Sequence, residues 1–142
     1  MTDRLKAMLK EHEGVRSFVY QCTAGYWTIG VGRNVDENGG MGLSDDEIDY
    51  LLENDIARCE KELTERYQWF TKLSGARRDA IISIFFNLGA TRFREFKKAL
   101  AAMALQDYER AATEFLDSRW AKQVKGRAIK LSDMITTNTY TD

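Results

Sequence analysis

The sequence contains no proline, only two cysteines and a single histidine among its 142 residues. Cys22 and Cys59 cannot form a disulfide framework, and with one histidine they are too few for a four-ligand zinc site. No segment approaches the roughly 18 consecutive apolar residues of a membrane-spanning helix. The N-terminus also lacks the basic and then apolar layout of a secretory signal. We therefore expect a chain that starts in a cytosol, without metal or cofactor.

The length suits one domain, residues 1–142, divided into two small lobes. A formal net charge of −1 argues against a dedicated nucleic-acid binder. Residues 1–60 nevertheless carry a net charge of −6 and residues 61–142 one of +5. Five basic residues and no acid lie between Arg119 and Lys130. That run is either a solvated helical face or a basic wall that attracts a polyanion.

The N-terminal part predicts a short helix followed by a hairpin. Thr2 or Asp3 can cap a helix that Gly14 ends. Aromatic and β-branched residues at 18–20 and 26–32 flank a polar turn with a glycine, which is typical of a β-hairpin. The run Gly30-Val31-Gly32 indicates a place where the backbone passes close to another group.

The rest of the sequence predicts helices. Ser44 and Glu47 form a capping box that opens a long helix, which we expect to run to about residue 65. Residues 80–88 are apolar nearly all round and predict a central helix that Gly89 ends. Amphipathic segments follow at 96–105, 107–116 and 123–135. The fold class is therefore α+β: a small lobe with a hairpin, one long helix and a helical bundle.

Three residues near the hairpin combine an acid, a thiol and a hydroxyl: Glu13, Cys22 and Thr28. If the hairpin folds back on the helix end, they converge, and such a group can hydrolyse an acetal. The acid protonates the leaving oxygen while its partners hold or activate a water molecule. By residue type alone, each also has a structural interpretation: a surface glutamate, a small residue in a tight bend and a β-branched residue in a strand.

The segment Glu13-Gly14, Cys22 and Gly25-Tyr26-Trp27-Thr28-Ile29-Gly30-Val31-Gly32 resembles the phage-type lysozymes, the muramidases of glycoside hydrolase family 24. That family has Glu, eight residues, Asp or Cys, five residues and then Thr. The resemblance extends to 86–89, 118–120 and 127–128, covers nearly the whole chain and is greatest to the T-even phage type. It implies a lysozyme-like α+β fold with a hairpin lobe at roughly 12–60, joined by a long helix to a helical lobe of 1–11 and 61–142.

The resemblance also implies a role for each site residue. Glu13 is expected to be the general acid, with Cys22 and Thr28 placing or activating water. Arg127 is expected to orient Glu13 rather than to assist proton transfer, because a nearby cation favours the ionised carboxylate. The expected substrate-binding residues are Gly32, Asn34, Phe86, Asn87, Ala99 and Glu114.

Two departures from the family pattern give further expectations. Arg33 stands where the family usually has histidine, and the acid of the long helix is kept as Asp55. We therefore predict an Arg33–Asp55 ion pair between hairpin and helix. Cys22 in place of Asp leaves no carboxylate between Glu13 and Asp36, so a mechanism with two carboxylates has no obvious second member.

The expected function is hydrolysis of the β-1,4 bond between N-acetylmuramic acid and N-acetylglucosamine in peptidoglycan during host-cell lysis. We expect a monomer that binds glycan strands and depends on a holin to leave the host cytoplasm and reach the wall. It would bind no nucleic acid, insert stably in no membrane and use no cofactor. One alternative is a catalytically silent module that binds peptidoglycan or a protein. A second is a hydrolase with a Cys22/His12 pair, although such a dyad rarely works without an orienting group.

Overall fold

Helix α1 (Asp3–Glu13) opens the computed structural model, which describes residues 2–141. The Thr2 hydroxyl accepts a hydrogen bond from the Leu5 N–H at 3.3 Å and caps the helix. Gly14 ends it with φ +81°, and its N–H donates to the Lys10 carbonyl at 2.9 Å. Both predicted ends of this helix are confirmed.

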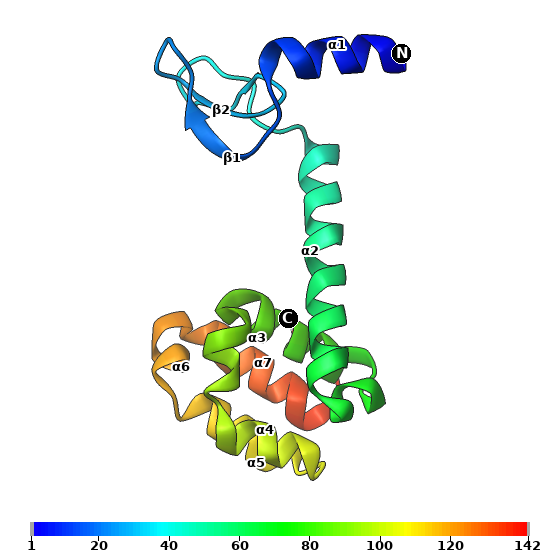
Figure 1. Cartoon of the computed structure of the whole chain (residues 1–142). Coiled ribbons are helices and arrows are strands. Elements are labelled where there is room, and N and C mark those ends of the chain that lie inside the picture. Colours follow the sequence, from blue (N-terminus) through cyan, green and yellow to red (C-terminus); the bar gives the residue numbers. More distant parts are fainter. Residues whose placement is uncertain (1, 142) are drawn as a thin grey trace. The chain divides into compact units, whose positions relative to one another are not determined.

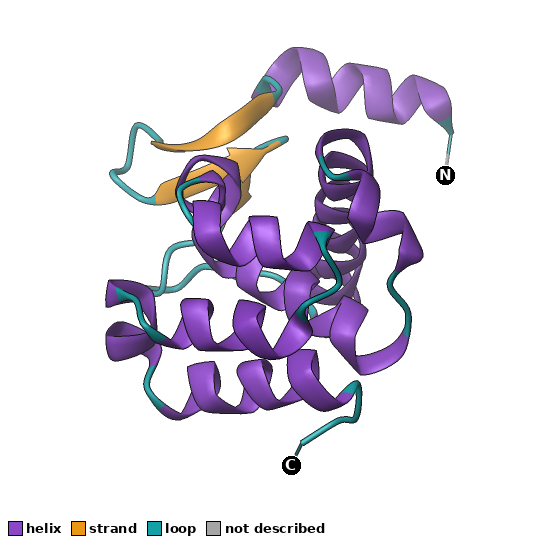
Figure 2. Ribbon diagram, turned by 90° about the horizontal axis from the view of Figure 1, so that it is seen from below, coloured by secondary structure: helices purple, strands orange, loops and turns teal. Residues whose placement is uncertain are grey.

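An antiparallel sheet of strands β1 (Arg16–Gln21), β2 (Trp27–Gly30) and β3 (Arg33–Asn34) follows, in the order β1-β2-β3. Figure 2 shows these strands gathered beside the end of α1. Tyr20 pairs with Thr28, and Thr28 pairs with Asn34 on its other side. The predicted hairpin is thus confirmed, whereas the short third strand has no signal of its own in the sequence.

The long helix α2 spans Asp45–Arg66 (Figure 1), close to the predicted bounds. The Ser44 hydroxyl accepts from the Glu47 N–H at 3.4 Å, while Glu47 Oε1 accepts from the Ser44 N–H at 2.9 Å. These reciprocal bonds are the predicted capping box.

The chain divides into two compact units, Met1–Leu51 and Leu52–Asp142. Unit 1 holds α1, the sheet and the start of α2. Unit 2 holds the rest of α2 and the remaining helices. The predicted grouping of residues 1–11 with the helical lobe stays a prediction.

Unit 2 contains all of the described hydrophobic core. Its further helices are η1 (Gln68–Lys72), α3 (Gly75–Arg94), α4 (Lys97–Ala104), α5 (Tyr108–Leu116), α6 (Arg119–Val124) and α7 (Gly126–Thr137). Helix α3 buries most of its central residues, as the apolar run predicts. Gly89 lies within α3 at φ +81° and ψ +167°, so it kinks the helix where the sequence predicts an end. Edge-to-face packing of Phe93 on Phe85 and Tyr67 links α3 to the segment after α2.

The helix boundary at Lys125 also differs from the prediction. The segment 123–135 does not form one helix: α6 ends at Val124 and α7 starts at Gly126. Between them Lys125 adopts φ +51° and ψ −113°, and its N–H donates to the Ala121 carbonyl at 2.8 Å. The apolar periodicity continues across this break, which is why the sequence pattern does not reveal it.

The α+β class predicted from the sequence is confirmed by the helices and the small sheet. Among residues 2–141, no helix has both the length and the apolar character that crossing a membrane requires.

Candidate active site

Glu13 is the last residue of α1, and its carboxyl lies directly over the turn between β2 and β3. A Cβ atom built on Gly32 would lie 2.7 Å from Glu13 Oε2 and 3.1 Å from Glu13 Cδ. Gly32 also has φ +65°, which side chains other than glycine rarely adopt. The close backbone approach predicted for this glycine run is therefore confirmed, and the group that it approaches is the Glu13 carboxyl.

Cys22 lies at the turn that joins β1 to β2. Its N–H donates to the Tyr26 carbonyl at 2.9 Å, and its own carbonyl accepts from the Gly25 N–H at 2.8 Å. Gly25, with φ +86°, lies in the five-residue connection between Gln21 and Trp27. The turn thereby places the half-buried Cys22 side chain close to backbone N–H groups. Hydrogen bonds from the N–H groups of Tyr26 and Ala24 lower the pKa of the Cys22 thiol.

Thr28 on β2 is a neighbour of Cys22. Its side chain also contributes to lowering the pKa of the Cys22 thiol. The Thr28 hydroxyl donates to the Tyr26 carbonyl at 2.9 Å, so this carbonyl accepts from both the Cys22 backbone and the Thr28 side chain. Thr28 is 4% exposed and is the only buried polar residue described in unit 1. The register of the hairpin thus brings two of the three predicted residues together.

Asp36 is the nearest carboxylate in the sequence after Glu13, and both of its oxygens accept hydrogen bonds from backbone N–H groups. Its Oδ2 accepts from the Trp27 N–H at 3.0 Å and its Oδ1 from the Asn38 N–H at 2.9 Å. Bonds from the N–H groups of Trp27 and Asn38 lower the pKa of Asp36. This side chain therefore fixes the loop after β3 to β2. In the sequence, the signal for this role of Asp36 is the turn pair Asn38-Gly39 that follows it.

Arg33 and Asp55 each have a partner other than the one predicted. Arg33 lies 2.5 Å from Glu47, and Asp55 lies 2.6 Å from Arg58 one turn along α2. The capping box identifies Glu47 as a cap, but no sequence signal pairs it with Arg33. A direct Arg33–Asp55 contact stays a prediction, since the two residues belong to different units.

The predicted substrate-binding residues lie in separate pockets. Asn34 lines a small pocket of unit 1 with Gly32, and its Oδ1 accepts from the Asp36 N–H at 2.9 Å. Phe86, Asn87 and Arg127 line a pocket of ≈ 740 Å³ in unit 2. The Phe86 ring is 46% exposed there, whereas Asn87 Oδ1 accepts from Trp120 Nε1 at 2.9 Å.

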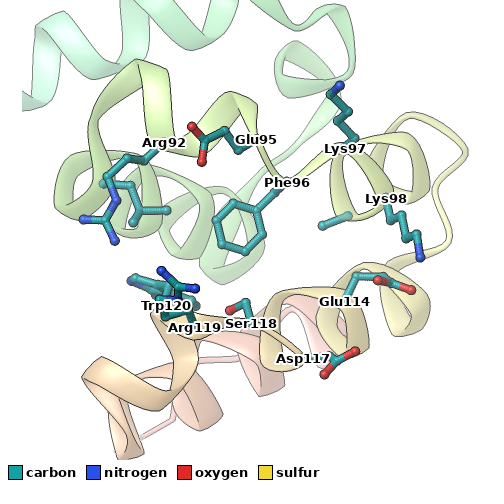
Figure 3. A pocket seen from close by; sticks show the side chains of 12 residues that line it. Arg92, Glu95, Phe96, Lys97, Lys98, Glu114, Asp117, Ser118, Arg119 and Trp120 are labelled. Atoms are coloured by element: carbon teal, nitrogen blue, oxygen red, sulfur yellow. The ribbon is translucent and has the colours of Figure 1, made fainter.

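Ala99 and Glu114 line a second pocket of unit 2, of ≈ 640 Å³, shown in Figure 3. Phe96 and Trp120 supply apolar surface, and charged side chains of both signs surround it. Ala99 is 1% exposed and belongs to the core, so it offers the pocket no more than a methyl surface. Within residues 2–141, no three His, Cys, Asp or Glu side chains are grouped as a metal site requires.

Comparisons with known proteins identify the family of this chain. The phage lysozyme family model matches residues 10–134. An endolysin of Acyrthosiphon pisum secondary endosymbiont phage 1 is 33% identical and covers 90% of this chain and 85% of its own. A probable T4-type lysozyme of Dictyostelium discoideum is 27% identical, covering 98% and 97%. The pre-baseplate central spike protein Gp5 of Enterobacteria phage T4 is 29% identical over 92% of this chain but only 27% of its own length. The chain belongs to the phage lysozyme family.

Proposed function

We propose that this lysozyme cleaves the β-1,4 bond between N-acetylmuramic acid and N-acetylglucosamine of peptidoglycan, with Glu13 as the general acid. The observation that carries the proposal is the position of Glu13. Its carboxyl lies against Gly32, which has no side chain, beside the hairpin that holds Cys22 and Thr28. A substrate oxygen can approach a carboxyl held in this way from the open side. Glu13 is exposed, so its proton is accessible to the glycosidic oxygen.

Thr28 and Cys22 supply the second half of the reaction. The Thr28 hydroxyl gives its hydrogen to the Tyr26 carbonyl, so its oxygen lone pairs are left to accept a hydrogen bond from water. Cys22 lies beside it with a lowered pKa and adds either a base or a further acceptor. Asp36 is committed to two backbone N–H groups, which favours a mechanism with a single essential carboxylate.

The substrate-binding roles of unit 2 are part of the same proposal. Phe86 and Asn87 would contact saccharide at one pocket, and Glu114 would do so at the other. Arg127 lines the pocket of Phe86, and its cation would orient the Glu13 carboxylate. These assignments rest on the family pattern and on the pocket that Phe86, Asn87 and Arg127 line together.

The test is the clearing of permeabilised Gram-negative cells by the wild type, Glu13→Gln and the control Glu11→Gln. Glu11 lies on the same exposed end of α1. Loss of a general acid lowers the rate by about 10²–10⁴-fold, so Glu13→Gln should be almost inactive and Glu11→Gln nearly normal. Full activity of Glu13→Gln would overturn the proposal. Release of reducing sugar by the wild type separates cleavage from binding alone.

Cys22 needs a separate experiment, because the alternative hypothesis is that its thiol attacks the substrate as a nucleophile. Cys22→Asp removes the thiol but keeps an acceptor beside Thr28, so the lysozyme mechanism expects activity to survive. Iodoacetamide treatment of Cys59→Ser, in which Cys22 is the remaining thiol, should abolish activity outright if Cys22 attacks the substrate. An inactive Cys22→Asp variant would favour the thiol mechanism.

The proposed biological role is lysis of the host cell from within, with access to the wall through a holin or a damaged membrane. The endolysin among the relatives is named for such lysis. Expression of the wild type inside bacteria should leave the culture intact until the inner membrane is permeabilised, and lysis should then follow only with an intact Glu13. Lysis without permeabilisation would contradict the access step.

A further inference from the structure

Arg33 directly follows Gly32, against which the Glu13 carboxyl lies, and its side chain binds a residue in the first turn of α2. Arg33 Nη1 donates to Glu47 Oε1 at 2.5 Å, lies equally close to Oε2, and also lies 3.4 Å from the Gly42 carbonyl. The same Glu47 carboxylate accepts from the Ser44 N–H at 2.9 Å and the Ser44 hydroxyl at 2.8 Å. One carboxylate therefore joins β3 to the first turn of α2. We call Arg33, Ser44 and Glu47 the hairpin brace.

The brace is one residue away from the catalytic contact. Arg33 follows Gly32 directly, and Gly32 is the residue whose missing side chain makes room for the Glu13 carboxyl. Arg33 also pairs with Ile29 in the sheet, next to the pair of Asn34 with Thr28. Fixing the Arg33 side chain thus fixes the backbone on which Glu13 lies, together with the strand that pairs with Thr28.

The chemistry of the brace is suited to precise positioning. Charge-assisted hydrogen bonds are shorter and stronger than neutral ones, and the two side chains are only 32% and 36% exposed. The carboxylate is held by two elements at once, so Arg33 has little freedom to choose another position. A glutamine at 47 would keep the size of the side chain but lose the charge that holds the guanidinium.

We propose that Glu47 is a positioning residue for the lysozyme reaction: through Arg33 it holds Gly32 and so the carboxyl of Glu13. This inference rests on the proposed role of Glu13 as the proton donor. A displacement of about 1 Å at a catalytic group can cost about 10²-fold in rate. Glu47 lies away from the reacting atoms, so its loss should lower kcat and leave KM nearly unchanged.

The experiment measures kcat and KM on purified peptidoglycan for Glu47→Gln, the charge-swapped double variant Arg33→Glu with Glu47→Arg, and Asp45→Asn. Asp45 is a matched control because it lies in the same acidic first turn of α2. All assays are run at a temperature where circular dichroism finds each variant folded. We expect Glu47→Gln to lower kcat about tenfold or more, the swap to recover part of that loss, and Asp45→Asn to keep the wild-type kcat.

A merely stabilising brace would lower Tm and leave kcat of the folded enzyme unchanged, and that result overturns the proposal. So does a swap with no more activity than Glu47→Gln. Asp55→Asn is included because Asp55 is the partner predicted from the sequence: a loss of kcat there, but not in Glu47→Gln, would assign the positioning to the other pair. If Glu13→Gln in the same assay stays active, the proposed function fails independently of the brace.

Discussion

At the scale of single residues, unit 1 depends on backbone conformations that glycine adopts far more readily than other residues. Gly32 has a positive φ and also leaves room for the Glu13 carboxyl, so it meets two requirements at once. Gly39 has φ +92° but no atom within 4 Å of where its Cβ would lie. Alanine substitutions at Gly32 and Gly39 therefore separate the cost of backbone strain from the effect of a methyl group on the Glu13 carboxyl.

We predict that Gly32→Ala loses most activity because its methyl group would displace the Glu13 carboxyl. Gly39→Ala should keep near-normal activity, since its cost is limited to backbone strain of about 1 kcal/mol. Clearing assays and thermal unfolding of both variants check this. Equal activity of the two would contradict the prediction that the room left by Gly32 is needed for the Glu13 carboxyl.

A second residue-scale feature is the Ser132 hydroxyl of α7. It is buried, and its oxygen has no hydrogen-bond partner among the described residues. An unsatisfied buried polar group costs about 1–3 kcal/mol. Ser118 is the opposite case, because its hydroxyl donates to the Phe115 carbonyl at 2.6 Å and accepts from the Ala121 N–H at 3.1 Å.

Ser132→Ala should therefore stabilise the protein by about 1 kcal/mol, whereas Ser118→Ala should destabilise it by about 1 kcal/mol through the loss of an N-cap. Urea unfolding measures both free energies. Destabilisation by Ser132→Ala would mean that the hydroxyl has a partner, such as a buried water molecule.

At the scale of elements, the junction of α6 and α7 concentrates strain. Lys125 has the dihedral angles of a glycine position and connects two helices that the sequence pattern would merge. The neighbouring Gly126 begins α7 and does not take up the strain. Lys122, one turn earlier, has ordinary helical surroundings in α6.

We predict that Lys125→Gly raises the free energy of unfolding by about 1 kcal/mol because it releases this strain. Lys122→Gly should lower it by about 1 kcal/mol, since glycine weakens a helix interior. Both variants lose one lysine charge, so they are matched electrostatically. Chemical denaturation compares them, and a loss of stability in Lys125→Gly would refute the strain.

At the scale of the whole molecule, stability has different sources in the two units. The apolar core is built from residues of unit 2, whereas the described polar network of Arg33, Asp36 and Glu47 lies in unit 1. No apolar side chain is buried among the described residues of unit 1, so this unit depends more on its polar contacts. The side chain of Arg33 and the Ser44 backbone and hydroxyl lower the pKa of Glu47 to about 2.

A carboxylate with a lowered pKa in the folded state stabilises the protein above its unfolded-state pKa, and this contribution disappears as pH falls through the folded-state value. The Glu47 contribution should thus be complete above about pH 4.5 and be lost toward about pH 2. We predict that Tm of Glu47→Gln is below that of the wild type at pH 6 and that the two converge near pH 2.

The control is Glu65→Gln, which removes an exposed carboxylate 4.0 Å from Lys61. Such a pair contributes little, so its Tm should follow the wild-type curve over the whole range. A difference between wild type and Glu47→Gln that stays constant from pH 6 to pH 2 would contradict the linkage.

The sequence by itself determined the local elements, because caps, glycines and apolar periodicity act over a few neighbouring residues. It located the end of α1 at Gly14, the hairpin and the capping box of α2, and its motif predicted Glu13, Cys22 and Thr28 as site residues. It also located the close backbone approach at Gly32, since two closely spaced glycines next to a strand often mark a place where another group lies against the backbone.

Only the tertiary structure decided which side chains share a partner. Arg33 binds Glu47, and Asp36 accepts hydrogen bonds from backbone N–H groups, because the fold of the loop after β3 brings these groups within hydrogen-bond distance. The break at Lys125 was likewise decided there. Apolar spacing records which face of a helix is buried, but the direction of the chain between two helices depends on the packing of both.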